Sequence, residues 1–216
     1  MRETVVFDLD DVLFDATFLK RVARERAVLS MIDAGLPVDF ETAIKTLSSV
    51  IEEKGEDYGK HFDEMLERLG IKWDPRIIAA GVVAYHNTKF SLLEPNPGIF
   101  KVILSLRDEG FRVGVASIGP AVKDWEKLIR LNLHHIFHVY KIGLSSWTEL
   151  FREMDPSATI LVSADPNGIA EAAKAGARTV RLLKGRFSHV KSKDADREVK
   201  DIWGILNAVK SLSEGL

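Results

Sequence analysis

The pattern of apolar positions divides the chain into three parts. Val5, Val6 and Phe7 form a short apolar run that is typical of a buried strand. From Ala16 to about Phe90, apolar side chains recur every three or four positions, which predicts helices with no strand between them. After the segment LLEPNPG, strand and helix patterns alternate to the end of the chain.

The alternating part predicts a parallel sheet that is covered by helices on both faces. Its expected strands are residues 112–116, 136–140, 159–162 and 178–183, and its expected helices are residues 99–109, 121–132, 147–154, 168–175 and 200–212. The charged segment 184–200 is expected to be a solvated connection. Because the first strand belongs to the same sheet, we expect a doubly wound α/β core formed by residues 1–14 and 95–216, with residues 15–94 inserted as a helical cap domain.

Composition narrows the classes of function. The chain has 216 residues, 46% of them hydrophobic, which is enough to bury a full core. A net charge of −2 without a long basic run argues against nucleic acid as a partner, and the lack of cysteine excludes disulfides and a cysteine nucleophile. No apolar stretch approaches the roughly 18 residues of a membrane span, so we expect a cytoplasmic protein with no membrane partner. The pattern leaves a monomer and a homodimer equally open.

Carboxylates follow the first strand directly, in the sequence TVVFDLDDVLFD. Ligands of open parallel sheets bind beyond the carboxyl ends of the strands, which is where Asp8 and Asp10 are expected. There, Asp8 could attack phosphorus, and Asp10 could protonate the leaving oxygen and later activate water. Two carboxylates and a phosphate repel one another unless a cation such as Mg²⁺ neutralises them. The alternative interpretation of these residues is an acidic turn or a helix cap.

The stretch VVFDLDDVL resembles the first motif of the haloacid dehalogenase superfamily, in the subgroup that carries a helical cap after the first strand. The segment AAKAGARTV also lies where that family has it, and GLPVDFETA and AYHNTKF are similar to stretches in the caps of archaeal members. The resemblance implies that Asp8 is the nucleophile and Asp10 the general acid and base, with Mg²⁺ held by Asp8 and by the main-chain carbonyl of Asp10. It further implies a small phosphorylated substrate, because the dehalogenases proper lack the second aspartate.

The second motif of the family is a Ser or Thr that ends the next strand and holds the phosphate. In RVGVASIG, Ser117 takes that place, and the backbone amides of Ile118 and Gly119 would add donors at the start of a helix. Without the first motif, Ser117 would be interpreted as an ordinary cap or turn residue.

The third and fourth motifs depart from the family pattern. The usual Lys-Pro pair is missing from HVYKIGLSSWTELF, and Lys141 is the nearest cation, with a solvated strand-end lysine as the alternative. Counting back from AGARTV puts Ser163 and Gly168 where the family has two acids, and only Asp165 is close. Either Asp165 completes the metal site together with Asp8 and Asp10, or it merely begins a turn before Pro166. In the second case the chain would be a weakly active or inactive relative that acts as a binding or regulatory module.

Further polar residues lie outside these motifs. His134, His135 and His138 are interpreted as structural or exposed, because no carboxylate pair accompanies them. Near the expected ligand edge of the sheet, Lys184 or Arg186 could also be present. On the last helix of the cap, some of four polar residues could face a substrate: Tyr85, His86, Asn87 and Lys89.

Overall fold

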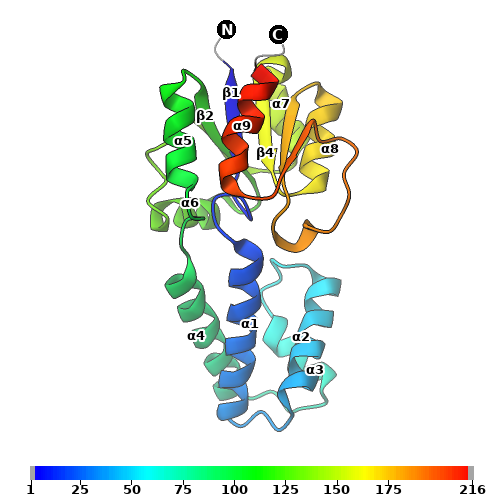
Figure 1. Cartoon of the computed structure of the whole chain (residues 1–216). Coiled ribbons are helices and arrows are strands. Elements are labelled where there is room, and N and C mark those ends of the chain that lie inside the picture. The colour runs from blue at the N-terminus through cyan, green and yellow to red at the C-terminus, as the bar shows by residue number, and fades with distance from the viewer. Residues whose placement is uncertain (1–2, 214–216) are drawn as a thin grey trace. The chain divides into compact units, whose positions relative to one another are not determined.

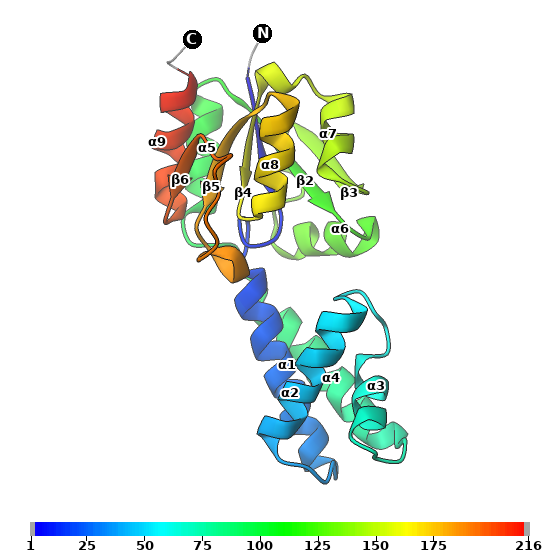
Figure 2. The same cartoon turned by 90° about the vertical axis from the view of Figure 1, so that its right-hand side faces the viewer.

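The computed structural model describes residues 3–213, and the chain divides into two compact units. One unit runs up to Thr17 and resumes at Leu93; the other is the segment Phe18–Leu92. Their helices and strands are labelled in Figures 1 and 2. Each unit has its own hydrophobic core, so the two are described separately.

The first unit is built around a six-stranded sheet in which every paired neighbour is parallel. The strands, in chain order, are β1 (Thr4–Asp8), β2 (Arg112–Ile118), β3 (Val139–Leu144), β4 (Thr159–Ser163), β5 (Arg178–Leu182) and β6 (Arg197–Val199). Their order across the sheet is β3-β2-β1-β4-β5-β6, so the chain winds outward from β1 in both directions. The predicted doubly wound α/β core is confirmed.

Helices cover both faces of this sheet. They are α5 (Ile99–Asp108), α6 (Ala121–Arg130), α7 (Trp147–Glu153), α8 (Pro166–Ala175) and α9 (Ile202–Ser213), with short 3-10 turns η1 (Pro156–Ala158) and η2 (Gly185–Phe187). Figure 2 shows α5 and α9 on one side of the sheet and α7 and α8 on the other. Every residue of β1 is buried, which explains why its sequence is an uninterrupted apolar run instead of an alternating one.

Strand register brings the functional candidates to one edge of the sheet. Asp8 is level with Ala116 on β2, and Ala116 is level with Lys141 on β3. On the other side of β1, Phe7 pairs with Val162, so that β4 ends at Ser163 beside the end of β1. The winding direction reverses between β1 and β4, which is where a doubly wound sheet opens a crevice for ligands.

The second unit is helical. Its elements are α1 (Ala16–Asp33, of which the first two residues belong to the first unit), α2 (Phe40–Lys54), α3 (His61–Arg68) and α4 (Pro75–Leu92). Asp39 caps α2 by accepting a hydrogen bond from the backbone of Thr42, as the sequence pattern DFET suggests. Among the side chains in its core are Met31, Leu47 and Met65. No helix in the described part of the chain is long and apolar enough to cross a bilayer.

Two sequence-based expectations in the core are wrong. The strand expected at residues 136–140 is formed instead by Val139–Leu144, because the apolar Phe137 precedes the strand and packs its ring against Phe7. The segment 184–200 is not simply a solvated connection, since it contains η2 and the edge strand β6. β6 has three residues, none of them fully buried, and therefore carries no apolar pattern that could predict it.

Candidate active site

Asp8 ends the central strand and is buried. Its Oδ1 accepts a hydrogen bond from the backbone N–H of Leu9 at 2.7 Å, and its Oδ2 accepts one from the hydroxyl of Ser163 at 2.6 Å. Burial raises the pKa of Asp8 well above its ordinary value, and the negative charges of Asp10 and Asp165 raise it further against the two hydrogen bonds. Such a perturbed carboxyl group at the ligand edge of a sheet is a candidate reactive group.

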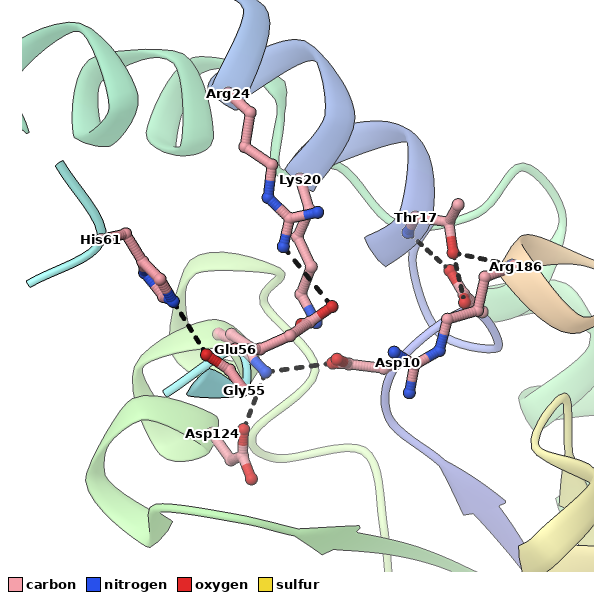
Figure 3. A network of polar contacts seen from close by, with 11 residues as sticks. Asp10, Thr17, Lys20, Arg24, Gly55, Glu56, His61, Asp124 and Arg186 are labelled. Carbon is pink, nitrogen blue, oxygen red and sulfur yellow. Dashed lines mark hydrogen bonds and ion pairs between the residues drawn. The ribbon is translucent and has the colours of Figure 1, made fainter. Parts of the chain in front are cut away.

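Asp10 lies on the loop after β1 and forms an ion pair with a lysine that sequence analysis missed. The Nζ of Lys127, on α6, lies 3.0 Å from Oδ1 of Asp10 and 2.8 Å from Oδ1 of Asp124. Figure 3 shows Asp10 and Asp124 with these contacts dashed. Burial alone would lower the pKa of Lys127, but the two carboxylates outweigh it and the pKa is raised. The ammonium group therefore stays charged between them.

Ser117 is buried near the end of β2, next to Ile118, whose side chain is exposed. The pairing of β2 with β3 shifts register between these two residues, where Gly143 is skipped. At this irregularity the backbone N–H of Gly143 donates to the hydroxyl oxygen of Ser117 across 3.4 Å. The structure thus places Ser117 on the strand next to Asp8, as the resemblance implies for a phosphate-binding hydroxyl.

The three residues that the fourth motif concerns lie at the end of β4, in the turn after it and in the first turn of α8. Ser163 donates its hydroxyl to Asp8 and accepts the backbone N–H of Asp165 at 3.0 Å. Asp165 is the N-cap of α8, with its Oδ1 accepting the backbone N–H of Asn167 at 3.0 Å. Gly168 lies against the ring of Trp147, so close that a Cβ atom added to it would be 2.8 Å from the indole Nε1. The space beside Gly168 is therefore occupied by tryptophan.

The fit of a magnesium ion can be judged from the donors at this edge. Asp8, Asp165 and the main-chain carbonyl of Asp10 supply oxygen only, which is the donor type that Mg²⁺ prefers. Within residues 3–213, however, no group of three or more His, Cys, Asp or Glu side chains is arranged to hold a metal. Because Mg²⁺ retains several water ligands in most protein sites, this donor set fits an ion bound largely through water.

Lys141 lies in the same row of the sheet as Asp8, two strands away. Its Nζ pairs with Glu153, near the end of α7, at 2.5 Å. Among the described contacts, the lysine that pairs with Asp10, on the loop after β1, is Lys127. The spacing of Asp124 and Lys127, three residues apart on a helix that follows β2, is the one signal in the sequence that could have found it.

Three of the remaining candidates, His138, Lys184 and Arg186, have structural partners. The ring Nδ1 of His138 accepts the backbone N–H of Val113 at 3.0 Å, which ties the loop before β3 to β2. Lys184 donates to Asn96 Oδ1 at 3.3 Å. The backbone N–H of Arg186 donates to the hydroxyl of Thr17 at 2.9 Å, as drawn in Figure 3.

The polar residues of the second unit contact one another. On α4, Lys89 lies over the ring of Tyr85, which also contacts the ring of His86. Figure 3 also shows Lys20 and Arg24 of α1, which pair with Glu56 at 2.6 and 3.4 Å. A role for these side chains in substrate selection stays a prediction.

Comparisons with known proteins agree with this architecture. The family model of haloacid dehalogenase-like hydrolases matches residues 3–176. The chain is 36% identical to the glyceraldehyde 3-phosphate phosphatase of Methanocaldococcus jannaschii over 99% of this chain and 100% of that protein. It is 37% identical to the protein of the same name from Methanopyrus kandleri, over 91% of this chain and 90% of that one.

Solved structures share the fold at lower identity. A protein from Thermotoga maritima described as a beta-phosphoglucomutase superposes with a TM-score of 0.74 at 21% identity, covering 97% of this chain and 99% of that one. A hydrolase from Bacillus subtilis, described as bound to magnesium, superposes with a TM-score of 0.63 at 16% identity over 95% and 99% of the two chains. At these identities the likeness concerns the fold alone.

Proposed function

The chain belongs to the haloacid dehalogenase-like hydrolase family, and we propose that it hydrolyses a phosphate monoester of a small molecule. The observation that carries this proposal is the buried Asp8 at the carboxyl end of the central strand, with Asp10 two residues further on and Ser117 on the neighbouring strand. A nucleophile, an acid–base group and a phosphate-binding hydroxyl are the three parts that such a reaction requires of a protein.

In the proposed first step, a carboxylate oxygen of Asp8 attacks phosphorus and forms an acyl phosphate, while the bond between phosphorus and the ester oxygen breaks. Asp10 gives its proton to that oxygen, so the leaving group departs as an alcohol. In the second step, Asp10 takes a proton from water, which attacks the same phosphorus and releases phosphate and the free Asp8 carboxylate. Ser117 and the backbone amide of Ile118 would bind the phosphate oxygens throughout.

We take glyceraldehyde 3-phosphate as the first substrate to test. The relative from Methanocaldococcus jannaschii is named glyceraldehyde 3-phosphate phosphatase, and it aligns with this chain along its whole length. The second relative of that name also aligns over most of both chains. The products would be glyceraldehyde and inorganic phosphate.

Magnesium is part of the proposal through the family resemblance. Asp8, the main-chain carbonyl of Asp10 and Asp165 would hold the ion, and the ion would supply positive charge beside the phosphate. Asp165 caps α8 through its Oδ1, so its other carboxylate oxygen would serve as the ligand. Lys141 stays a predicted phosphate-binding residue that would have to leave Glu153.

The test is release of phosphate from glyceraldehyde 3-phosphate and from p-nitrophenyl phosphate with MgCl₂ present. We expect turnover by the natural chain and none by Asp8→Asn, because the amide is not a nucleophile for this reaction. Turnover equal in the two proteins, or absent from both with every phosphate ester tried, would overturn the proposal.

A second candidate function is a catalytically weak or inactive binding module. The observation that favours it is the pair of substitutions at the fourth motif, where Ser163 holds Asp8 and Gly168 is packed against Trp147. A module of this kind would bind orthophosphate or a phosphorylated ligand in calorimetry and would not hydrolyse the phosphorylated ligand. Turnover that Asp8→Asn abolishes would decide for the enzyme.

A further inference from the structure

Lys127 joins two elements of the core through two carboxylates. Asp10 comes from the loop after β1 and Asp124 from the first turn of α6, and the Nζ of Lys127 lies within 3.0 Å of an oxygen of each. The side chain of Lys127 also passes near the ring of Phe14, with its Nζ 5.8 Å from the ring centroid. An ammonium group held from three directions has little rotational freedom left.

Asp124 has few reasons to be buried apart from this lysine. Its side chain is 5% exposed, and its Oδ2 has no hydrogen-bond partner in the described part of the chain. A buried carboxylate is costly unless a cation or several donors compensate it. Asp124 therefore depends on Lys127, and in turn it fixes where the ammonium group stands.

The position of the Lys127 ammonium group determines where the Asp10 carboxylate lies. Asp10 lies on a loop, and a loop carboxylate could adopt several rotamers without a fixed partner. Proton transfer requires the acid to lie within hydrogen-bonding distance of the ester oxygen in one orientation. Lys127 provides such a fixed partner at a distance typical of a charge-assisted hydrogen bond.

We propose that Lys127, itself held by Asp124, is a positioning residue that orients Asp10 for proton transfer to the leaving group. This inference rests on the proposed function, because it assigns a role within that reaction. Lys127 would take this role from α6, whereas Lys141, on β3, is engaged with Glu153. The proposal predicts that the need for Lys127 depends on how much protonation the leaving group requires.

The test compares two esters that differ in their leaving groups, with purified full-length protein and MgCl₂ present. The glyceraldehyde part of the first ester leaves as an alkoxide unless its oxygen is protonated, whereas the p-nitrophenolate of the second departs readily without a proton. Because Asp10 also acts in the second step, which both esters share, the rate constant compared is that of leaving-group release in a single turnover. For Lys127→Met we expect it to fall about 100-fold with the first ester and by about threefold or less with the second. Lys127→Arg should restore about a tenth or more of the lost rate, since it keeps the ion pair with altered geometry.

Two further variants separate positioning from folding. Lys210→Met is the matched control, because it removes a lysine ion pair, with Glu109, from another helix of the core, and it should not change the ratio of the two rates. Asp124→Asn should reproduce the change in ratio in weaker form, because it acts only through Lys127. Thermal unfolding of each variant reports whether the fold is intact.

Equal losses with both esters in Lys127→Met and in Asp124→Asn would show a structural role only and overturn the inference while leaving the proposed function standing. No loss with either ester would overturn it as well. A natural chain that turns over no phosphate ester tried overturns the proposed function, and this inference with it.

Discussion

The hydroxyl of Ser163 donates a hydrogen bond to Oδ2 of Asp8 across 2.6 Å, where the family resemblance places a carboxylate. The two residues end neighbouring strands, β4 and β1, and both are buried. A second carboxylate in this position would repel Asp8 unless a cation lay between them. Serine instead satisfies an oxygen of Asp8 directly, so the chain stabilises this carboxyl group without requiring a metal at that point.

Ser163→Ala should destabilise the fold. The substitution leaves Oδ2 of Asp8 buried without the hydroxyl that donates to it, and it removes the acceptor of the Asp165 backbone N–H. Losing a buried hydrogen bond to a charged or polar partner costs about 1–3 kcal/mol. Urea unfolding at neutral pH measures the change. A loss below about 0.5 kcal/mol would contradict the reading of this bond as a stabilising one.

Ser163→Asp should exchange stability for metal affinity. A carboxylate in place of the hydroxyl adds a negative charge beside Asp8 and, at the same time, an oxygen ligand for Mg²⁺. In EDTA we expect Ser163→Asp to melt at a lower temperature than the natural chain. Adding MgCl₂ should raise its melting temperature more than that of the natural chain, because a ligand that binds only the folded state stabilises that state. The control is Ser163→Asn, which has nearly the same shape without the charge and should show no extra response to MgCl₂. An equal response of all three proteins would argue against a metal position between residues 8 and 163.

Asp8→Asn should stabilise the chain at neutral pH while it removes activity. Burial, reinforced by Asp10 and Asp165, raises the pKa of Asp8, so the folded chain holds this proton more tightly than the unfolded chain does. Between the unfolded pKa of about 3.9 and the raised folded pKa, the stability of the natural chain therefore falls as the pH rises. Asparagine carries no such charge, and each unit of pKa elevation corresponds to about 1.4 kcal/mol.

The measurement is urea unfolding of both proteins in EDTA at several pH values from about 4 to about 8. The advantage of Asp8→Asn should grow with pH and vanish near the lower limit. A constant difference across this range would mean that titration of Asp8 does not contribute to it.

The fold could be predicted because the central strands are apolar throughout and the helices have a clear period. β1 and β4 are buried at every position, so each appears in the sequence as a short apolar run between polar segments. β6 has no such pattern, because an edge strand of three residues needs none. The apolar Phe137 makes the sequence predict the third strand too early, since an apolar side chain in a loop can also pack into the core.

The site could be predicted only where one strand end carries several of its residues. Asp8 and Asp10 adjoin the same strand, so local sequence was enough to group them. Lys127 is 117 residues away from Asp10, and their contact depends on how α6 lies after β2. At Ser163 the sequence shows only that an acid of the family pattern is missing, because a sequence pattern does not reveal that its hydroxyl reaches Asp8.

Gly168→Asp would restore an acid at the second fourth-motif position, and we expect it to destabilise the chain. A Cβ atom at Gly168 would lie 2.8 Å from Nε1 and 3.0 Å from Cε2 of Trp147, whose ring is buried. Overpacking of this kind typically costs about 1–3 kcal/mol. Trp147→Leu makes room for the new side chain. The double variant should therefore lose less free energy of unfolding than the two single variants lose together. Simple additivity in a double-mutant cycle would show that the indole ring does not keep residue 168 small.

Gly185→Ala should loosen the attachment of η2 to the start of α1. Gly185 has a positive φ of 68°, and a Cβ atom there would overlap the carboxylate of Asp11. That carboxylate accepts hydrogen bonds from the backbone N–H and the hydroxyl of Thr17, at 2.8 and 2.7 Å, and Thr17 in turn accepts the backbone N–H of Arg186. Alanine would have to displace Asp11 and so break these bonds, in addition to straining its own backbone.

Gly110→Ala is the matched control for this substitution. Gly110 also has a positive φ, of 91°, but no atom lies within 4 Å of the position where its Cβ would be. The control should therefore lose only the backbone term of about 1–2 kcal/mol. We expect Gly185→Ala to lose about 1–3 kcal/mol more than that, since at least one partly buried hydrogen bond to a carboxylate is broken as well. Equal free energies of unfolding for the two variants would show that Asp11 moves aside without cost and that the contacts of Thr17 do not hold η2 in place.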